Sequence, residues 1–427
     1  MQKNKSFKTD ESFIILRKNN SQTLIANNPP LTLIKNREHA YAFSSLENSP
    51  IKNFQCHSEK EVVDAVNWVR DKKLRFTSKM CAEEDRPAFI DLSKLNHISI
   101  DKSNGIAKVQ GGALVSQMDR HTYPLGMAVP AGMVSYNRVA DLLPLGGQNI
   151  LMNQYGFTVD HLQSVEMVLA DGSLIQAFEA QNQDLFIALK GGGKVFGIIT
   201  SMEFKMQPIE KENVGGMLIY PMRIGKKVIS SYRKYAMLSP NEMSVSLLFL
   251  TLANGLKAVG VHSAWVGNKK EGMRQLGIFQ GLIEPLADFT QMMPYYKLQK
   301  GLDPYLAGVP RENKFSGYFS ELSPELIEEL LFFAEKIGSN SRVLINALKG
   351  ATLSLQTNNK EPATNWYIEI IPKWENSKGK DLQIEWAASF WEAISSHTHH
   401  PGWKEIKPQS IDWDQVINKY DPDHFFG

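Results

Sequence analysis

Apolar residues recur at strand and helix spacing along residues 53–208 of the chain. Ser58 stands three residues before Glu61, which is the arrangement of a helical capping box, and apolar residues at helical spacing follow it. Asp171-Gly172 separates two apolar runs, as expected of a β-hairpin. The pattern predicts a helix after residue 58, a second helix over 185–189, and strands over 54–56, 74–76, 88–92, 107–112, 164–169, 173–177 and 196–204.

The second half of the chain alternates longer helical patterns with strand-like runs. The helical patterns cover 226–236, 269–280, 324–337 and 413–420, and the strand-like runs cover 243–252, 256–266, 342–346 and 366–372. A layer of strands with helices on one side of it is typical of an α+β domain. The sequence therefore predicts an α+β architecture for this half.

Length and composition are those of an ordinary globular protein with two domains, with 427 residues, 43% hydrophobic residues and a net charge of +2. This charge balance does not indicate a nucleic-acid or membrane-surface partner. The two cysteines, Cys56 and Cys81, do not form a disulfide scaffold, and no window is long and apolar enough to span a membrane. Because the N-terminal residues also lack the apolar stretch of a signal peptide, we interpret the chain as a soluble cytoplasmic protein of open oligomeric state.

Common catalytic and metal-binding motifs are missing from the sequence. There is no G-x-S-x-G nucleophile elbow, no P-loop and no G-x-G-x-x-G after a strand. The densest imidazole cluster, at 397–400, has no acidic partner at a recognisable spacing, and metal ligands must converge on one point, so we predict no metal site. We expect instead a loop at a pocket mouth, with His399 in contact with substrate and Trp403 as an apolar anchor.

Several motifs occur in an order and at spacings that resemble a known family. Those in the first half are FIDLSKLN at 89–96, VQGGA at 109–113, GMAVPAG at 126–132, VLADG at 168–172, DLFIALKGGG at 184–193 and FGIIT at 196–200. Those in the second half are MPYYKLQ at 293–299, YIEIIPKW at 367–374 and KYDPDHF at 419–425. In this order they resemble the berberine-bridge-enzyme-like oxidases, a branch of the flavoproteins with a PCMH-type FAD-binding domain.

The resemblance implies an α+β fold with two domains. Residues 1–208, closed by 405–427, would form a PCMH-type (vanillyl-alcohol-oxidase-type) FAD-binding domain. Residues 209–404 would form an α+β substrate domain with an antiparallel sheet. The partner expected from the resemblance is a small-molecule substrate.

The FAD-binding loops of this family differ from the corresponding stretches here. Family members hold the FAD pyrophosphate with backbone N–H groups on two glycine-rich loops. The stretch matching the first loop, 75–87, has no glycine and no flavin-linking histidine, and it places three acidic residues (83–85) where a dianion would sit. Like charges repel at such a site.

The second family loop corresponds to 130–156. Four positions where the family has glycine are occupied by Arg138, Asp141, Leu145 and Asn149. Four glycines remain: Gly132, Gly146, Gly147 and Gly156. No cysteine at 129–133 offers a second covalent link, and the sequence ends at Gly427, before residues that touch the flavin in the family. We therefore predict that FAD has been lost and that no cofactor is used.

The alternative is FAD bound without a covalent link. Arg138 would then contact phosphate, because arginine is a good bidentate phosphate ligand. The remaining cofactor contacts would be Gly146, Gly147, Gly192, Gly193 and Ile198.

The strand at 367–371 carries the candidate catalytic residues. Alternation puts Tyr367 and Glu369 on one face. The resemblance places this face over the flavin, with a carboxylate that acts as general base in some relatives. A carboxylate in a mostly apolar wall can serve as acid or base near neutral pH. Three tyrosines are candidate substrate contacts, with core or rim positions as the alternative: Tyr295, Tyr296 and Tyr318.

The leading hypothesis is a small-molecule biosynthetic enzyme that catalyses a redox-neutral acid–base step, such as a cyclisation, dehydration or isomerisation, with Glu369 and Tyr367 as catalytic residues. One alternative is a non-covalent FAD-dependent oxidoreductase of the same family. The other is a non-catalytic binding protein.

Overall fold

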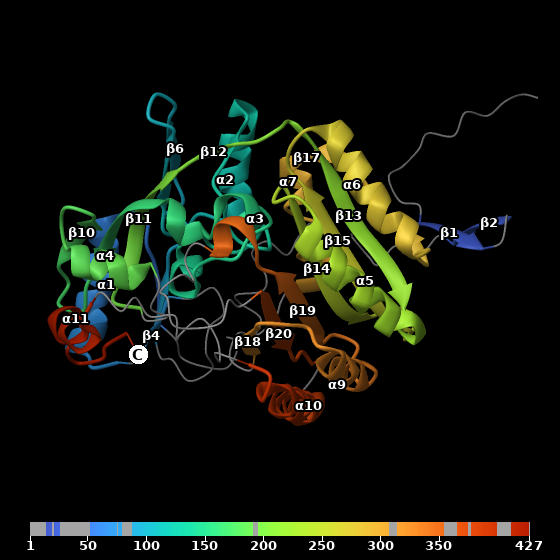
Figure 1. Cartoon of the computed structure of the whole chain (residues 1–427). Coiled ribbons are helices and arrows are strands. Elements are labelled where there is room, and N and C mark those ends of the chain that lie inside the picture. Colours follow the sequence, from blue (N-terminus) through green and yellow to red (C-terminus); the bar gives the residue numbers. More distant parts are fainter. Residues whose placement is uncertain are drawn as a thin grey trace, which may run out of the picture.

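The computed structural model describes residues 14–18, 21–25, 52–74, 76–78, 88–190, 195–306, 314–353, 365–374, 377–398 and 411–426. Apart from a short hairpin of β1 (Ile14–Lys18) and β2 (Ser21–Ile25), these elements form two units, which lie to the left and right in Figure 1. Both units combine helices with sheets, which confirms the predicted α+β fold. In the described part of the chain, no helix is both long and apolar enough to cross a membrane.

The first unit contains a parallel three-stranded sheet and an antiparallel five-stranded sheet. The parallel sheet has the order β3 (Lys52–Gln55), β5 (Ala88–Asp91), β4 (Phe76–Thr77). The antiparallel sheet has the order β10 (Leu174–Phe178), β9 (Leu162–Val168), β11 (Ile198–Lys205), β7 (Ile106–Gln110), β6 (Ile98–Asp101). The two-stranded pair β8 (Met127–Ala128) and β12 (Gln207–Pro208) leads toward the second unit.

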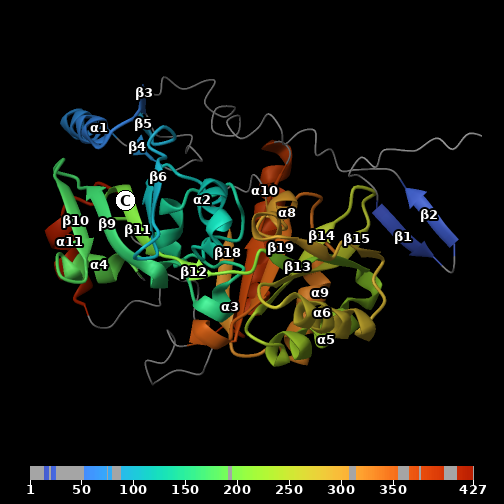
Figure 2. The same cartoon turned by 90° about the horizontal axis from the view of Figure 1, so that it is seen from above.

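Helices surround these two sheets. They are α1 (Glu59–Asp71), α2 (Val115–Thr122), α3 (Met152–Tyr155), α4 (Gln183–Leu189), α11 (Trp413–Tyr420), and the 3-10 turns η2 (Tyr123–Leu125), η3 (Ala140–Leu145) and η4 (Thr158–His161). α1 contacts β5 of the parallel sheet and β9 and β11 of the antiparallel sheet, so it joins the two. In Figure 2, α1 and the parallel sheet lie above the antiparallel sheet.

The first helix begins where the sequence predicts. The Ser58 hydroxyl accepts a hydrogen bond from the Glu61 N–H at 3.3 Å, and the Glu61 carboxylate accepts one from the His57 N–H at 2.8 Å. These bonds satisfy backbone donors that have no partner inside the helix. Val62 and Val66 are fully buried toward the sheets. The predicted capping arrangement is present, with the return bond made to His57 instead of Ser58.

The second unit is built on one eight-stranded antiparallel sheet. Its order is β16 (Ala287–Asp288), β13 (Glu212–Pro221), β15 (Lys257–Trp265), β14 (Met243–Thr251), β19 (Arg342–Ala347), β20 (Trp366–Ile371), β18 (Phe315–Phe319), and β17 (Gln291–Pro294) also pairs with β13. Four long helices pack on one face around a common hydrophobic core: α5 (Gly225–Leu238), α6 (Lys269–Leu282), α9 (Pro324–Ala334) and α10 (Ser377–Ser395). The short helices are η5 (Met222–Ile224), α7 (Tyr295–Leu298), α8 (Asp303–Leu306) and η6 (Gly350–Leu353). The antiparallel sheet predicted for this half is thus confirmed.

Several elements were not predicted from the sequence, among them α2, α10, β13 and β18. β13 carries Gly215 and Gly216 at its centre, and paired glycines interrupt the alternation that identifies a strand. Gly215 is required there because a Cβ would lie 2.2 Å from the backbone oxygen of Ser263. α10 begins with polar residues. Its apolar residues, such as Phe390 and Ile394, are explained by the hydrophobic core in which they are buried.

The helix-free face of the large sheet packs against the first unit. Tyr318 and Tyr367 belong to the hydrophobic core of the first unit rather than to the core beneath the helices. The Ser135 N–H and hydroxyl donate to the Asp303 carboxylate at 2.8 and 2.6 Å. The Gln299 amide donates to the Gly132 carbonyl at 2.8 Å. Apolar and polar contacts therefore hold the two units together.

The C-terminal helix returns to the first unit. Lys419 and Tyr420 of α11 bind the Asp184 carboxylate at the start of α4, at 2.9 and 2.8 Å. After α11, Phe425 and Phe426 pack on Phe76, with ring centroids 5.1 and 5.8 Å apart.

Asp119 of α2 is a buried carboxyl near this junction. It is 1% exposed, and neither carboxylate oxygen has a hydrogen-bond partner among the described residues. Burial raises the pKa of Asp119 well above its usual range; Lys300 opposes this shift and Asp303 adds to it. The folded state therefore holds the carboxyl neutral where the unfolded chain ionises it, so stability falls as pH rises above the usual aspartate pKa.

We expect Asp119→Asn to remove this loss. The variant should unfold at a higher temperature than the parent at pH 7–8, and the difference should shrink toward pH 4, as measured by thermal unfolding across pH. The control is Asp101→Asn, because hydrogen bonds from Ser103 and Asn104 lower the pKa of the exposed Asp101 to about 2. That variant should lose stability at neutral pH relative to the parent. If the unfolding temperatures of Asp119→Asn and the parent depend on pH in the same way, the Asp119 carboxyl is not held neutral in the folded protein.

Candidate functional site

The strand pair β18–β20 positions the candidate catalytic residues. Register places Tyr318 opposite Tyr367 and Ser316 opposite Glu369. Strand alternation turns these four side chains to the face that meets the first unit, whereas Ile368 lies in the core under the helices. The predicted shared face of Tyr367 and Glu369 is therefore present.

Polar side chains line up along this face. The Lys314 ammonium forms an ion pair with the Glu369 carboxylate, and the two side chains are 27% and 14% exposed. The Tyr367 hydroxyl lies beside the Glu369 and Ser316 side chains, both of which influence its pKa. Burial, followed by the charge of Glu369, raises the pKa of Tyr367 well above its usual range, so its hydroxyl remains a hydrogen-bond donor. Tyr367, Glu369 and the partly exposed Lys314 thus stand in a row along this face.

Tyr318 lies beside Tyr367, with ring centroids 5.2 Å apart. The Gln148 side chain, from the first unit, lies beside the Tyr318 hydroxyl and opposes the rise in the pKa of Tyr318 that burial causes. The Gln148 side-chain oxygen also accepts a bond from the Asn346 amide at 2.8 Å. Gln148 therefore ties the loop after η3 to β19 of the large sheet and brings that loop to the face that carries Glu369.

The loop that contains Gln148 begins with two left-handed glycines. Gly146 has φ of 75° and Gly147 has φ of 77°. Their carbonyls accept the N–H groups of Val159 and Thr158 at 3.2 and 3.0 Å. In a trans peptide the N–H points opposite to the C=O, so the N–H groups of Gly147 and Gln148 point away from η4. Two successive N–H groups of this kind form a site for an anion or a polar ring edge.

The substituted glycine positions reinforce this loop. Arg138 and Asp141 form a buried two-bond ion pair at 3.2 and 2.8 Å. The Asn149 amide donates to the carbonyls of Gly147 and Gly156, both at 3.1 Å. The side chains that replace family glycines thus satisfy one another and hold the turn, and the Arg138 guanidinium is engaged by Asp141 rather than free for a phosphate.

The remaining predicted residues lie in several places. Tyr295 is buried in a separate cluster with Ala128 and Leu298, and Tyr296 packs edge-on against Tyr123 at 5.3 Å. Neither tyrosine joins the group around Glu369. Ile198 is buried at the start of β11. Gly192, Gly193, His399 and Trp403 lie outside the described residues, as do most of 75–87 and its three acidic residues.

Sequence reasoning missed Lys314, Ser316 and Gln148. Lys314 and Ser316 belong to β18 and the residue before it, and this strand was not predicted. Their contacts with β20 depend on pairing between strands about 50 residues apart, which no local pattern encodes. Gln148 follows the retained Gly146-Gly147 pair, so its position next to a glycine turn was the available clue.

Comparisons with known proteins agree on the class of cofactor. Residues 50–177 match the family model described as an FAD binding domain. An uncharacterised FAD-linked oxidoreductase of Bacillus subtilis is 24% identical over 90% of this chain and 91% of its own length. An FAD-linked oxidoreductase of Dictyostelium discoideum is 26% identical over 60% of this chain, a match that spans only 57% of that relative.

Solved structures show the same fold. The moss Physcomitrella patens BBE-like 1 protein superposes with a TM-score of 0.74 at 17% identity, over 88% of this chain and 89% of its own. The 6-hydroxy-D-nicotine oxidase of Arthrobacter nicotinovorans superposes with a TM-score of 0.72 at 16% identity, over 89% and 92% of the two chains. At this identity the likeness establishes the fold alone.

These comparisons correct one expectation from the sequence. The prediction that no cofactor is used is wrong, because the FAD-binding-domain match and the FAD-linked relatives point to FAD. The described residues fit a flavin at the 146–148 turn, where two N–H groups lie on the side that faces away from η4 and Gln148 reaches the face that carries Glu369. The error was to infer loss of FAD binding from the replacement of glycines, because every residue except proline keeps its backbone N–H.

Proposed function

We propose that this chain is an FAD-linked oxidoreductase and that it oxidises a small molecule with FAD bound without a covalent link. Support comes from the match to an FAD binding domain, the FAD-linked relatives and the berberine-bridge-enzyme-like fold. The observation that carries the proposal is the match of residues 50–177 to an FAD-binding domain, joined to a polar network on the sheet face opposite its glycine turn. The non-covalent mode rests on the absence of histidine in 75–87 and of cysteine in 129–133.

The cofactor would be held mainly by backbone. The N–H groups of Gly147 and Gln148 are the described donors suited to it, and the Arg138–Asp141 pair would fix the loop rather than bind phosphate. FAD, when bound, supplies the acceptor for the two electrons and the hydrogen that leave the substrate carbon.

The chain's own residues would bind the substrate and receive its proton. A substrate hydroxyl placed against Tyr367 can pass its proton through the Tyr367 hydroxyl to the neighbouring Glu369 carboxylate. The partly exposed Lys314 ammonium balances the negative charge of the Glu369 carboxylate. Tyr318, which packs against Tyr367, offers a flat apolar ring with a polar tip beside the reacting group. An alcohol or phenol with an apolar body is the substrate class that this arrangement favours.

The proposal is tested with the FAD-loaded protein under anaerobic conditions. Mixing it with a panel of alcohols and phenols should bleach the visible flavin absorbance for some members, and admitting an oxidant should restore it. Matched amines and carboxylic acids of the same size serve as controls for the substrate class. If no alcohol or phenol reduces the flavin while an added chemical reductant does, the proposed reaction is wrong.

A further inference from the structure

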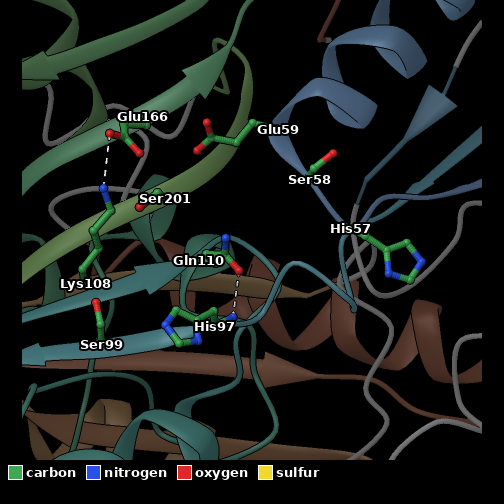
Figure 3. Close-up of a pocket in the computed structure, with 9 residues that line it drawn as sticks. All are labelled: His57, Ser58, Glu59, His97, Ser99, Lys108, Gln110, Glu166 and Ser201. Atoms are coloured by element: carbon green, nitrogen blue, oxygen red, sulfur yellow. Dashed lines mark hydrogen bonds and ion pairs between the residues drawn. The ribbon is translucent and has the colours of Figure 1, made fainter.

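A polar cavity of about 410 Å³ lies between the start of α1 and the antiparallel sheet (Figure 3). Its volume is in the range of small-molecule sites. All of its lining residues come from the first unit, so it is separate from the face that carries Glu369. They are His57, Ser58, Glu59, His97, Ser99, Lys108, Gln110, Glu166 and Ser201.

Ser201 is a buried hydroxyl that faces this cavity. It is 2% exposed, and its Oγ has no hydrogen-bond partner among the described residues. Leaving a buried hydroxyl unpaired destabilises the folded state. Ser201 follows a bulge in β11 and stands opposite Glu166 of β9. Because a bulge re-aims the side chains beside it, the strand irregularity turns this hydroxyl toward the cavity.

The charges around the cavity are mixed. Glu166 accepts a bond from the Lys108 ammonium at 3.3 Å, and Glu59 accepts one from the Thr200 hydroxyl at 3.4 Å. An anion would face two carboxylates, whereas a cation would face Lys108 and the positive end of the α1 dipole. Neither sign of charge is favoured, and the lining has no tyrosine, tryptophan or phenylalanine on which a nucleobase would stack.

The lining offers both hydrogen-bond donors and acceptors. Lys108, Ser201 and the Gln110 side-chain amide are donors, while the carboxylates of Glu59 and Glu166 are acceptors. The Gln110 side-chain oxygen is already occupied by the His97 N–H at 2.8 Å, so its NH₂ group is the end left for a ligand. Adjacent hydroxyl groups that each donate and accept match such a surface.

We propose that this cavity binds a neutral polyhydroxylated ligand, a sugar or sugar alcohol. Its hydroxyls donate to Glu59 and Glu166 and accept from Ser201 and Gln110. The ligand bridges α1 and the antiparallel sheet, and its binding does not depend on the flavin or on Glu369.

The test titrates the full-length protein with methyl α-D-glucoside, followed by ligand-observed NMR. The blocked anomeric carbon separates binding here from oxidation elsewhere. Ser201→Ala should weaken binding about fivefold, because one hydrogen bond is lost. The same variant should unfold at a higher temperature than the parent without ligand, because an unpaired buried hydroxyl is removed. Replacing a residue with a merely structural role would not weaken ligand binding and at the same time raise the unfolding temperature.

Ser263→Ala is the matched control. Ser263 is 3% exposed, and its Oγ also lacks a partner among the described residues, but it lies on β15 of the second unit. It should raise the unfolding temperature and leave glucoside binding unchanged. Glu166→Gln, which keeps the shape of the side chain, should weaken binding about tenfold, since hydrogen bonds to a charged acceptor are stronger.

Three results would overturn the proposal. The first is no binding of either methyl α-D-glucoside or sorbitol. The second is tighter binding of inorganic phosphate or of tetramethylammonium than of the glucoside, with the same sensitivity to Ser201→Ala. The third is glucoside binding that Ser201→Ala and Ser263→Ala change equally.

Discussion

Glu369→Gln is expected to slow substrate-dependent flavin reduction by about 10²–10⁴-fold, the usual contribution of a positioned acid–base group. The amide keeps the size of the side chain and can still hydrogen-bond to Tyr367 and Lys314. It cannot accept the substrate proton. FAD content and unfolding temperature should therefore stay close to those of the parent. Rapid-mixing measurements of flavin reduction across pH provide the readout.

The control for this variant is Glu335→Gln, an exposed glutamate at the end of α9. It should leave the rate of flavin reduction unchanged. Tyr367→Phe removes the hydroxyl that links substrate to Glu369 and should slow the same step. A reduction rate within threefold of the parent for Glu369→Gln, at every pH, contradicts the role assigned to the carboxylate.

Gly147→Ala is expected to destabilise the folded protein by about 3 kcal/mol or more, from left-handed strain and crowding together. Gly147 has φ of 77°, and a Cβ there would lie 2.3 Å from the Thr158 hydroxyl oxygen. Thr158 cannot withdraw freely, because that hydroxyl donates to the Gly147 carbonyl at 2.8 Å. The variant should also bind FAD more weakly, since the Gly147 and Gln148 N–H groups move with the turn.

A second glycine separates strain from crowding. Gly255 has φ of 81°, but a Cβ there meets nothing within 4 Å. Gly255→Ala should therefore cost only about 1–2 kcal/mol, the strain of a left-handed residue. Urea unfolding of both variants measures the difference. If both variants lose the same free energy of unfolding, crowding against Thr158 is not the reason that position 147 requires glycine.

The sequence predicted the parts of the fold that depend on local pattern. The helix at 413–420 was placed with its observed bounds because its apolar residues recur at helical spacing. The shared face of Tyr367 and Glu369 was predicted because alternation in a strand is local. β13 was missed because Gly215 and Gly216 interrupt that alternation.

The contacts that complete the site could not be predicted from the sequence, for a physical reason. Lys314 meets Glu369 through the pairing of β18 with β20, and Gln148 meets Tyr318 across the junction of the two units. Both depend on which distant segments pair. The cofactor prediction failed differently, because replaced glycines were taken as lost donors. Arg138 and Asp141 instead bind each other and keep the turn in place.

The most direct measurement is the flavin content of the purified full-length protein after incubation with FAD. The protein is freed of unbound FAD, precipitated with acid, and the flavin is assayed in the supernatant and in the pellet. The account predicts about one FAD per chain, all of it released into the supernatant. A protein that stays colourless after incubation with FAD contradicts the proposed oxidoreductase function, and flavin that remains in the pellet contradicts the non-covalent mode.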